Sequence, residues 1–249
     1  GSPRRSNWGS RRDCCMRSSP ERGKNFVFVL AEAELETIPK EILSERAVVA
    51  NAKARDKKAS NLLLDASYHH SAMRPLKDGD RRGRPDIAHF FLLLCLDSRL
   101  NKSGRLKIII HTRNDEKISV ASDTRLPPSY HRFMGLMESL FQNSTVPSKQ
   151  KPLIELEKGW TLRDILTAEK CNKVILLDAD GPDMNLQSVL SDDDSKIIAV
   201  VIGGFPSGKF RSDLSSIDIT KLSLGKDMLK AWTVTSEMLV AAQASIKGP

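Results

Sequence analysis

Short apolar runs alternate with longer amphipathic stretches along most of this 249-residue chain. The short runs, which predict buried strands, occupy 26–36, 61–67, 106–112, 117–122, 173–181, 196–204 and 217–224. The stretches with the 3.6-residue period of a helix occupy 39–60, 84–100, 127–143, 161–169 and 227–246. Because alternating strands and helices are typical of α/β proteins, we expect a mostly parallel sheet with helices on both sides.

A few residues indicate where these elements begin. Pro39 and Pro85 each suit the first turn of a helix, where the missing amide hydrogen has no partner to lose. Thr161 is a candidate N-cap for the helix that follows it. The polar residues 113–116 separate two strands and predict a hairpin.

The positive charge of the chain is concentrated at its beginning. Of the formal net charge of +8, residues 1–24 contribute +5, from seven basic and two acidic residues. The rest holds 32 basic and 29 acidic residues. Since 1–24 lacks hydrophobic periodicity, we expect a basic tail without fixed structure, or a segment added for expression. The overall charge is therefore a poor argument for nucleic-acid binding, and local patches must supply one.

Cysteine usage and hydropathy restrict the location and the cofactors. Cys14, Cys15, Cys95 and Cys171 form no CxxC pair and no metal-ligand spacing, so no metal site is expected. Cys95 and Cys171 are predicted to be reduced, small core residues. No apolar run is long enough to span a membrane, and no secretory signal is visible. A cytoplasmic protein fits these observations best.

The stretch GGFPSGKF, residues 203–210, follows an apolar strand and raises the possibility of a P-loop. The P-loop pattern requires Ser or Thr after the lysine and then a helix. Phe210 stands at the hydroxyl position, and the next residues predict a turn and a short strand. The G-x-G-x-x-G dinucleotide fingerprint is absent too. Binding of a nucleoside triphosphate or a dinucleotide is therefore disfavoured.

Three consecutive strand ends, at 178–181, 203–208 and 222–225, instead open into loops. In parallel sheets, ligands bind beyond the carboxyl ends of the strands. The three loops are therefore a candidate site. On pattern alone, ordinary strand-to-helix turns explain them at least as well.

Two basic stretches are candidates for contact with RNA. In 81–90, Arg84 could bind a phosphate or a base edge, and Asp86 could hold that arginine by a charge-assisted hydrogen bond. The alternative is that Asp86 only complements the dipole of the helix that begins there.

The second basic stretch, 124–137, places Arg125, Ser129 and Arg132 around the start of another helix, where the arginines could bind phosphates. Its alternative is a solvated helix face. Spacing alone favours the structural explanation for both stretches. The histidines form no catalytic set, and His89 is expected to be a core residue whose hydrogen bonds are satisfied.

Taken together, three segments resemble one known family. RRGRPDIAHFFLLLCLDSRLNKSGRLKIIIHT (81–112), RLPPSYHRFMGLMESLF (125–141) and VVIGGFPSGKF (200–210) look, in that order, like the archaeal and eukaryotic ribosomal-RNA pseudouridine N1-methyltransferases. These enzymes belong to the SPOUT superfamily. The resemblance runs from about residue 26 to the last predicted helix. It implies a single domain over 25–249 with an internal hairpin and helix extension around 99–125, and a C-terminal trefoil knot.

The resemblance also implies chemistry and partners. The expected cofactor is S-adenosyl-L-methionine, and the expected substrate is a pseudouridine in a hairpin loop of small-subunit rRNA. A homodimer is implied as well, with ribosomal proteins as further candidate partners in subunit biogenesis. By match to the family, the expected cofactor-binding residues are Leu177, Asp178, Gly203, Gly208, Leu222, Ser223, Leu224 and Leu229. Arg84, Asp86, Arg125, Ser129 and Arg132 are expected to contact RNA, with Asp86 and Arg84 as the catalytic pair.

Two other functions stay open at the level of sequence. The first is another SPOUT RNA methyltransferase, which acts on a ribose 2′-hydroxyl or on a different base. The second is a non-catalytic, rRNA-binding assembly factor that keeps an unused cofactor fold. Binding of the cofactor separates the second alternative from an enzyme, and a substrate with uridine in place of pseudouridine separates the first.

Overall fold

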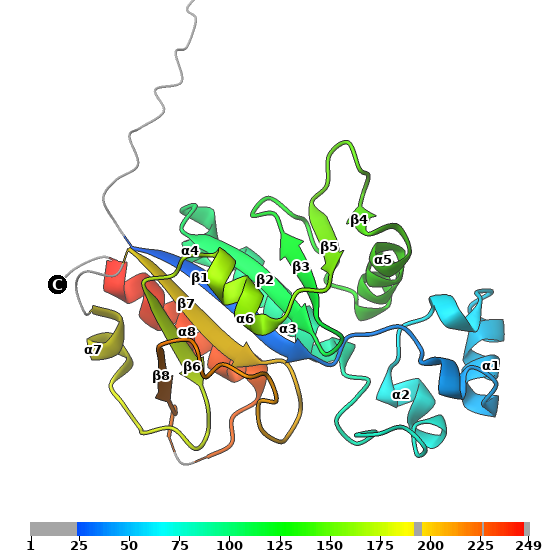
Figure 1. The fold of residues 1–249 in the computed structure, drawn as a ribbon. Coiled ribbons are helices and arrows are strands. Elements are labelled where there is room, and N and C mark those ends of the chain that lie inside the picture. The colour runs from blue at the N-terminus through cyan, green and yellow to red at the C-terminus, as the bar shows by residue number, and fades with distance from the viewer. Residues whose placement is uncertain (1–23, 192–195, 226, 247–249) are drawn as a thin grey trace, which may run out of the picture.

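The computed structural model describes residues 24–191, 196–225 and 227–246. They form an eight-stranded sheet in the order β4–β5–β3–β2–β1–β7–β6–β8, with helices around it (Figure 1). The strands are β1 Asn25–Ala33, β2 Leu106–Thr112, β3 Glu116–Val120, β4 Thr145–Val146, β5 Ile154–Lys158, β6 Lys173–Leu177, β7 Ile197–Gly203 and β8 Ile219–Leu222.

The sheet has a parallel half and an antiparallel half. Strands β2, β1, β7, β6 and β8 pair in parallel, whereas β3, β5 and β4 continue the sheet beyond β2 in antiparallel pairs. The central strands β1 and β7 are buried along almost their whole length, which explains their continuous apolar runs. The predicted hairpin at 113–116 joins β2 to β3 and is confirmed.

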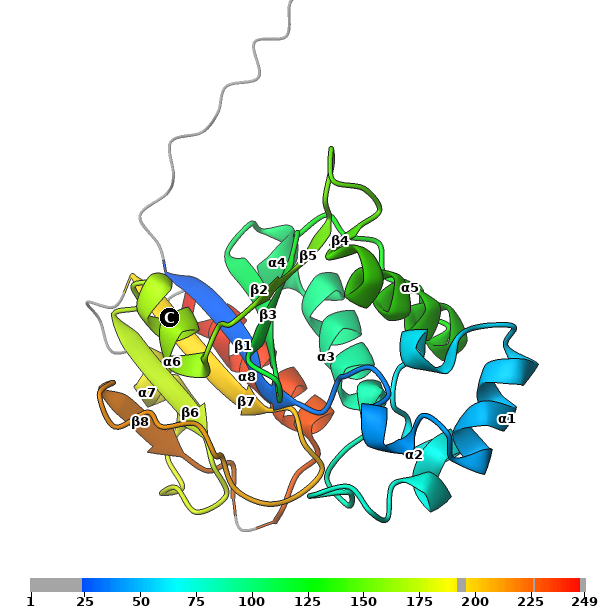
Figure 2. The same ribbon diagram turned by 45° about the vertical axis from the view of Figure 1, so that its right-hand side comes forward.

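Helices cover both faces of the sheet, as expected. They are α1 Arg46–Ala54, α2 Ala66–His69, α3 Pro85–Asp97, α4 Arg99–Lys102, α5 Tyr130–Asn143, α6 Leu162–Ala168, α7 Leu186–Ser191 and α8 Ala231–Ile246. Phe26, Phe28 and Leu30 of β1 face the core that includes α3, α5 and α8. The alternate residues Val27 and Val29 face α6, which lies in front of the sheet in Figure 1 and Figure 2.

Residues 38–76 pack around a small core of their own, at the right-hand end of Figure 1. An ion-pair cluster joins this lobe to α5. The carboxylate of Glu138, fully buried on α5, accepts hydrogen bonds from Arg55 at 2.6 and 2.8 Å and from Lys57 at 2.6 Å. The backbone amide of Leu63 also donates to Glu138, at 3.4 Å.

Two expected elements in this lobe are wrong. The helix predicted over 39–60 is interrupted: a 3-10 turn, Lys40–Ile42, is followed by α1 only from Arg46. The strand predicted over 61–67 does not form. Its only ladder contact in the described chain is an isolated bridge between Leu63 and Thr37. The apolar run is buried because its leucines fill the core of the lobe, which explains the misleading pattern.

Other element boundaries agree more closely with expectation. Pro85 occupies the first turn of α3, and Thr161 caps α6 in a capping box with Asp164. The prediction missed α2, β4, β5 and α7. Strand β5 has the sequence IELEK, which does alternate apolar and charged residues as a half-buried strand does, but the run is only five residues long. Helix α7 has only six residues, too few for a periodic signal.

Cys95 is buried and Cys171 is half-buried, and both are free thiols, as predicted. Burial raises the pKa of Cys171 to about 11. Within the described ranges, no helix combines the length and apolar character needed to cross a bilayer. Cys14 and Cys15 lie outside the described residues, as does the predicted basic tail except for Lys24.

Candidate functional site

The loops after β6, β7 and β8 enclose one cavity of about 290 Å³. These strands are adjacent and parallel, so their carboxyl ends reach the same edge of the sheet. The lining includes all eight residues expected from the resemblance to bind the cofactor: Leu177, Asp178, Gly203, Gly208, Leu222, Ser223, Leu224 and Leu229. The structure thus brings together residues from three separate segments. Their role toward a ligand remains a prediction.

Glycines let the backbone segments around the cavity approach one another closely. A Cβ atom on Gly181 would lie 2.8 Å from the backbone carbon of Leu222, and one on Gly204 would lie 2.6 Å from Cα of Ala33. Gly208 has a φ of +94°, which favours glycine. Close backbone contacts therefore fix the shape of the loops that surround the cavity.

Lys209 shows why the glycine loop differs from a P-loop. Its ammonium group pairs with Asp180 at 2.7 Å and thus joins the first and second loops. This ion pair lowers the pKa of Asp180. No helix follows the glycine loop over residues 204–218. A phosphate cradle at a helix N-terminus is therefore not formed, in agreement with the sequence argument.

Arg84 and Asp86 line a second cavity, of about 600 Å³, at the N-terminus of α3. The Arg84 guanidinium binds both carboxylate oxygens of Asp86, at 2.8 and 2.7 Å. The side chains are 27% and 32% exposed, so the pair is accessible to a ligand. Such a bidentate pair fixes the orientation of both groups. The structure thus confirms the expected contact between them.

Asp65 and Tyr130 also line this second cavity, although neither was among the site residues expected from the sequence. The Tyr130 hydroxyl donates to Oδ2 of Asp65 at 2.6 Å. Burial, together with the hydrogen bond to Asp65, raises the pKa of Tyr130. The expected strand over 61–67 had hidden Asp65, which instead precedes α2 as its N-cap. Sequence spacing gave no sign that Tyr130, the first residue of α5, would lie within hydrogen-bond distance of Asp65.

The remaining candidates for RNA contact are not among the residues that line this cavity. Arg125, Ser129 and Arg132 are exposed, and Ser129 directly precedes α5, whose first residue is Tyr130. His89 is a satisfied core residue, as predicted. Its Nε2 lies 2.9 Å from the carbonyl oxygen of Pro127, and its ring stacks on Phe133 with 4.4 Å between centroids.

A sequence model of the EMG1/NEP1 methyltransferases matches residues 28–243. The chain belongs to this methyltransferase family. The ribosomal RNA small subunit methyltransferase Nep1 of Methanothrix thermoacetophila is 45% identical over 212 residues, which cover 85% of this chain and 92% of that protein. The Nep1 of Thermococcus sibiricus is 42% identical over 88% of this chain and 97% of its own length.

A solved relative agrees with the fold. The crystal structure of Archaeoglobus fulgidus Nep1 bound to S-adenosylhomocysteine superimposes with a TM-score of 0.78 at 38% identity, and the match covers 90% of this chain and 98% of that chain. Membership of the family confirms the resemblance that was drawn from segments 81–112, 125–141 and 200–210. The C-terminal trefoil knot and the division into domains remain predictions.

Proposed function

We propose that this chain methylates N1 of a pseudouridine in a hairpin loop of small-subunit rRNA, with S-adenosyl-L-methionine as the methyl donor. The observation that carries the proposal is the single cavity lined by all eight expected residues of the three strand-end loops. Two similarities support it: the Nep1 relatives are named small-subunit rRNA methyltransferases, and the solved relative holds S-adenosylhomocysteine.

The cavity after β6, β7 and β8 fits such a cofactor. Leu177 and Leu222 supply buried apolar walls, and the glycines expose backbone groups for hydrogen bonds. Its volume is near the lower end of the range of about 300–1,000 Å³ for small-molecule sites. When bound, S-adenosylmethionine supplies an activated methyl group. The loops would orient it and exclude water from it.

The Arg84–Asp86 pair suits the acceptor side of the reaction. Pseudouridine is joined to ribose through carbon, so its N1 keeps a hydrogen, whereas N1 of uridine forms the glycosidic bond. Methyl transfer to N1 must be accompanied by loss of that proton. Asp86, held in place by Arg84, would orient the N1–H group or accept its proton. A hairpin-loop base is accessible to the cavity because it need not be extracted from a duplex.

The two cavities share no lining residue, and an apolar groove between α3 and α8 lies next to both. The groove includes Phe90, which also lines the Arg84–Asp86 cavity. It also includes Trp232, which follows Ala231, a lining residue of the cavity after β6, β7 and β8, called the donor cavity from here on. Phe90 and Val240 are 46% and 68% exposed.

We propose that a second copy of the chain covers this groove and completes the site as a homodimer. Sedimentation should then show a dimer, and Val240→Glu should weaken it.

An assay with paired RNA hairpins tests the function. One hairpin carries pseudouridine in its loop and the other carries uridine at the same position. We expect methyl transfer to the first hairpin only. Equal transfer to both would instead indicate a ribose or another base as the acceptor. Tight binding of both hairpins without any transfer would indicate an assembly factor.

Gly208→Val should lower the affinity for S-adenosylhomocysteine by at least about tenfold, because φ of +94° is strained for a β-branched residue at the cavity wall. Gly104→Val is the matched control. Gly104 also has a positive φ, +71°, but lies outside the cavity. Calorimetric titration and thermal melts of both variants provide the comparison. If the control lost as much affinity as Gly208→Val, general backbone strain would explain the effect.

RNA binding should weaken steeply with salt if Arg125 and Arg132 contact phosphates. Each phosphate contact to single-stranded RNA contributes about −0.7 to the slope of log K against log salt concentration. The double variant Arg125→Gln, Arg132→Gln should therefore have a slope shallower by about 1.4. A slope equal to that of the unmodified chain would remove these two residues from the interface.

A further inference from the structure

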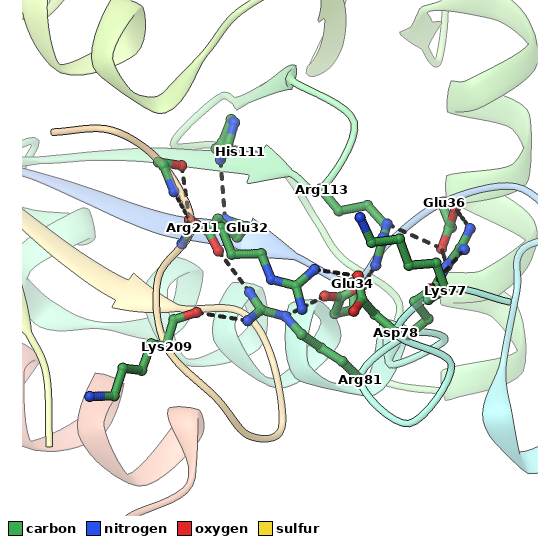
Figure 3. A network of polar contacts seen from close by, with 12 residues as sticks. Glu32, Glu34, Glu36, Lys77, Asp78, Arg81, His111, Arg113, Lys209 and Arg211 are labelled. Atoms are coloured by element: carbon green, nitrogen blue, oxygen red, sulfur yellow. Dashed lines mark hydrogen bonds and ion pairs between the residues drawn. The ribbon is translucent and has the colours of Figure 1, made fainter.

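Three glutamates at alternate positions lie at the carboxyl end of β1 and just beyond it, and they are buried close together (Figure 3). Glu32, Glu34 and Glu36 are 5%, 1% and 3% exposed. Buried carboxylates are costly unless they are paired. Arg81, Arg82 and Arg113 compensate them with ion pairs between 2.6 and 2.8 Å. The hydrophobic pattern gave no sign of this network, and none of these six charged side chains lines the donor cavity or the Arg84–Asp86 cavity.

Arg81 connects this network to the glycine loop. Its Nη2 donates to Glu32 and its Nε to Glu34, both at 2.7 Å. Its Nη1 donates to the carbonyl oxygen of Lys209 at 2.8 Å. The same guanidinium lies 3.6 Å from the ring centroid of Phe205. Lys209 and Phe205 both line the donor cavity, so one buried side chain contacts two lining residues of the glycine loop.

Glu32 binds the far end of the same loop. Its Oε1 accepts hydrogen bonds from the backbone amides of Arg211 and Ser212 and from the Ser212 hydroxyl, at 2.7, 2.8 and 2.8 Å. Glu32 itself has a φ of 52°, a left-handed conformation that is strained for a residue with a side chain. Its amide donates to Nδ1 of His111 at 3.1 Å. The surrounding contacts therefore enforce an unfavourable backbone at this position.

We propose that Arg81 and Glu32 are positioning residues that hold residues 204–212 in the shape that closes the donor cavity. The inference rests on the proposed function, because it concerns the same cavity.

The segment that carries Arg81 also reaches the Arg84–Asp86 pair. The amide of Arg84 donates to the carbonyl oxygen of Glu34 at 3.0 Å, and its side chain holds Asp86. The glycine loop and the Arg84–Asp86 pair are thus both hydrogen-bonded to residues at the end of β1.

The neighbouring arginine offers a matched control. Arg82 forms a bidentate pair with Glu36, at 2.8 Å for both bonds, and is 12% exposed against 7% for Arg81. Within the described part of the chain, its hydrogen bonds go to Glu36 and to the carbonyl oxygen of Lys77, and not to residues 204–212. Arg81→Lys and Arg82→Lys both keep the charge and lose the planar guanidinium that forms two ion-pair hydrogen bonds at once, from Arg81 to Glu32 and Glu34 and from Arg82 to Glu36. Only the first variant also loses contacts to the glycine loop.

Two measurements on the full chain test the proposal: titration with S-adenosylhomocysteine, and hydrogen exchange at the amides of Arg211 and Ser212. For Arg81→Lys we expect an affinity at least tenfold lower and faster exchange at both amides. In methylation assays, KM for the cofactor should rise more than kcat falls. For Arg82→Lys we expect an affinity within twofold of the unmodified chain and unchanged exchange, even where its Tm falls.

Equal effects of the two substitutions would overturn the proposal, since the network would then contribute only stability. Unchanged affinity and exchange in Arg81→Lys would overturn it as well. If Arg81→Lys does not fold, Phe205→Leu removes the stacking on Arg81 together with the edge contact to Phe210, and should still raise the exchange rate at both amides. If the unmodified chain fails to bind S-adenosylhomocysteine, the proposed function fails. The exchange rates then decide by themselves whether Arg81 holds the loop.

Discussion

Replacement of Asp86 by asparagine is expected to lower the rate of methyl transfer by about 10²–10⁴-fold, the usual contribution of a positioned acid or base. The amide keeps the size of the side chain but cannot accept a proton from N1. It also removes the negative charge that fixes Arg84 through two hydrogen bonds. Single-turnover methylation of the pseudouridine hairpin measures the effect directly.

Asp97→Asn is the control for this substitution. Asp97 lies at the other end of α3 and pairs with Lys102 on the surface. Because Asp97 lines the α3–α8 groove and not the Arg84–Asp86 cavity, the Asp97→Asn dimer should methylate at the unmodified rate, and sedimentation checks that the dimer is intact. Loss of an acid near the N-terminus of α3 costs about 0.3–1 kcal/mol through the helix dipole, so Asp86→Asn should remain folded. Methylation by Asp86→Asn at the unmodified rate would remove Asp86 from the reaction.

Glu138→Ala is expected to destabilise the chain by about 3 kcal/mol, near the lower end of the range for breaking a buried ion pair. The substitution leaves Arg55 and Lys57 without their shared carboxylate, and the Leu63 amide without an acceptor. The low end applies because the two cations are 17% and 37% exposed and can regain water. Urea denaturation followed by circular dichroism measures the loss.

Glu157→Ala tests whether burial is the reason. Glu157 pairs with Lys117 at 3.3 Å, but its side chain is 50% exposed. A surface pair contributes about 0–1 kcal/mol, so this variant should be almost as stable as the unmodified chain. Similar losses for Glu138→Ala and Glu157→Ala would contradict the assignment of Glu138 as the anchor between α5 and the 38–76 lobe.

The sequence predicted those parts of the fold in which hydrophobic pattern and sheet geometry agree. The runs that became β1, β2, β6 and β7 are continuous because both faces of these strands are covered. Parallel pairing then brings the strand-end loops together, which is why spacing along the chain suggested a shared site. The resemblance to the family then indicated which residues of those loops to expect at the site.

Long-range contacts explain what the pattern could not predict. The 61–67 run is apolar because it fills the core of the lobe, and only the packing of that lobe distinguishes it from a strand. Asp65 reaches Tyr130 across 65 positions, and Glu32 reaches Arg211 across 179. Such contacts carry no signal in local composition. The alternation of Glu32, Glu34 and Glu36 resembles a solvated strand face, yet all three side chains are buried.

Calorimetric titration of the full chain with S-adenosylhomocysteine, beside ATP with magnesium, tests the central claim most directly. The claim is that the three strand-end loops form a preformed methyl-donor site. The account predicts saturable binding of S-adenosylhomocysteine, weakened in Gly208→Val, and no binding of ATP. Binding of ATP without binding of S-adenosylhomocysteine would contradict it, because the glycine loop would then hold phosphates after all.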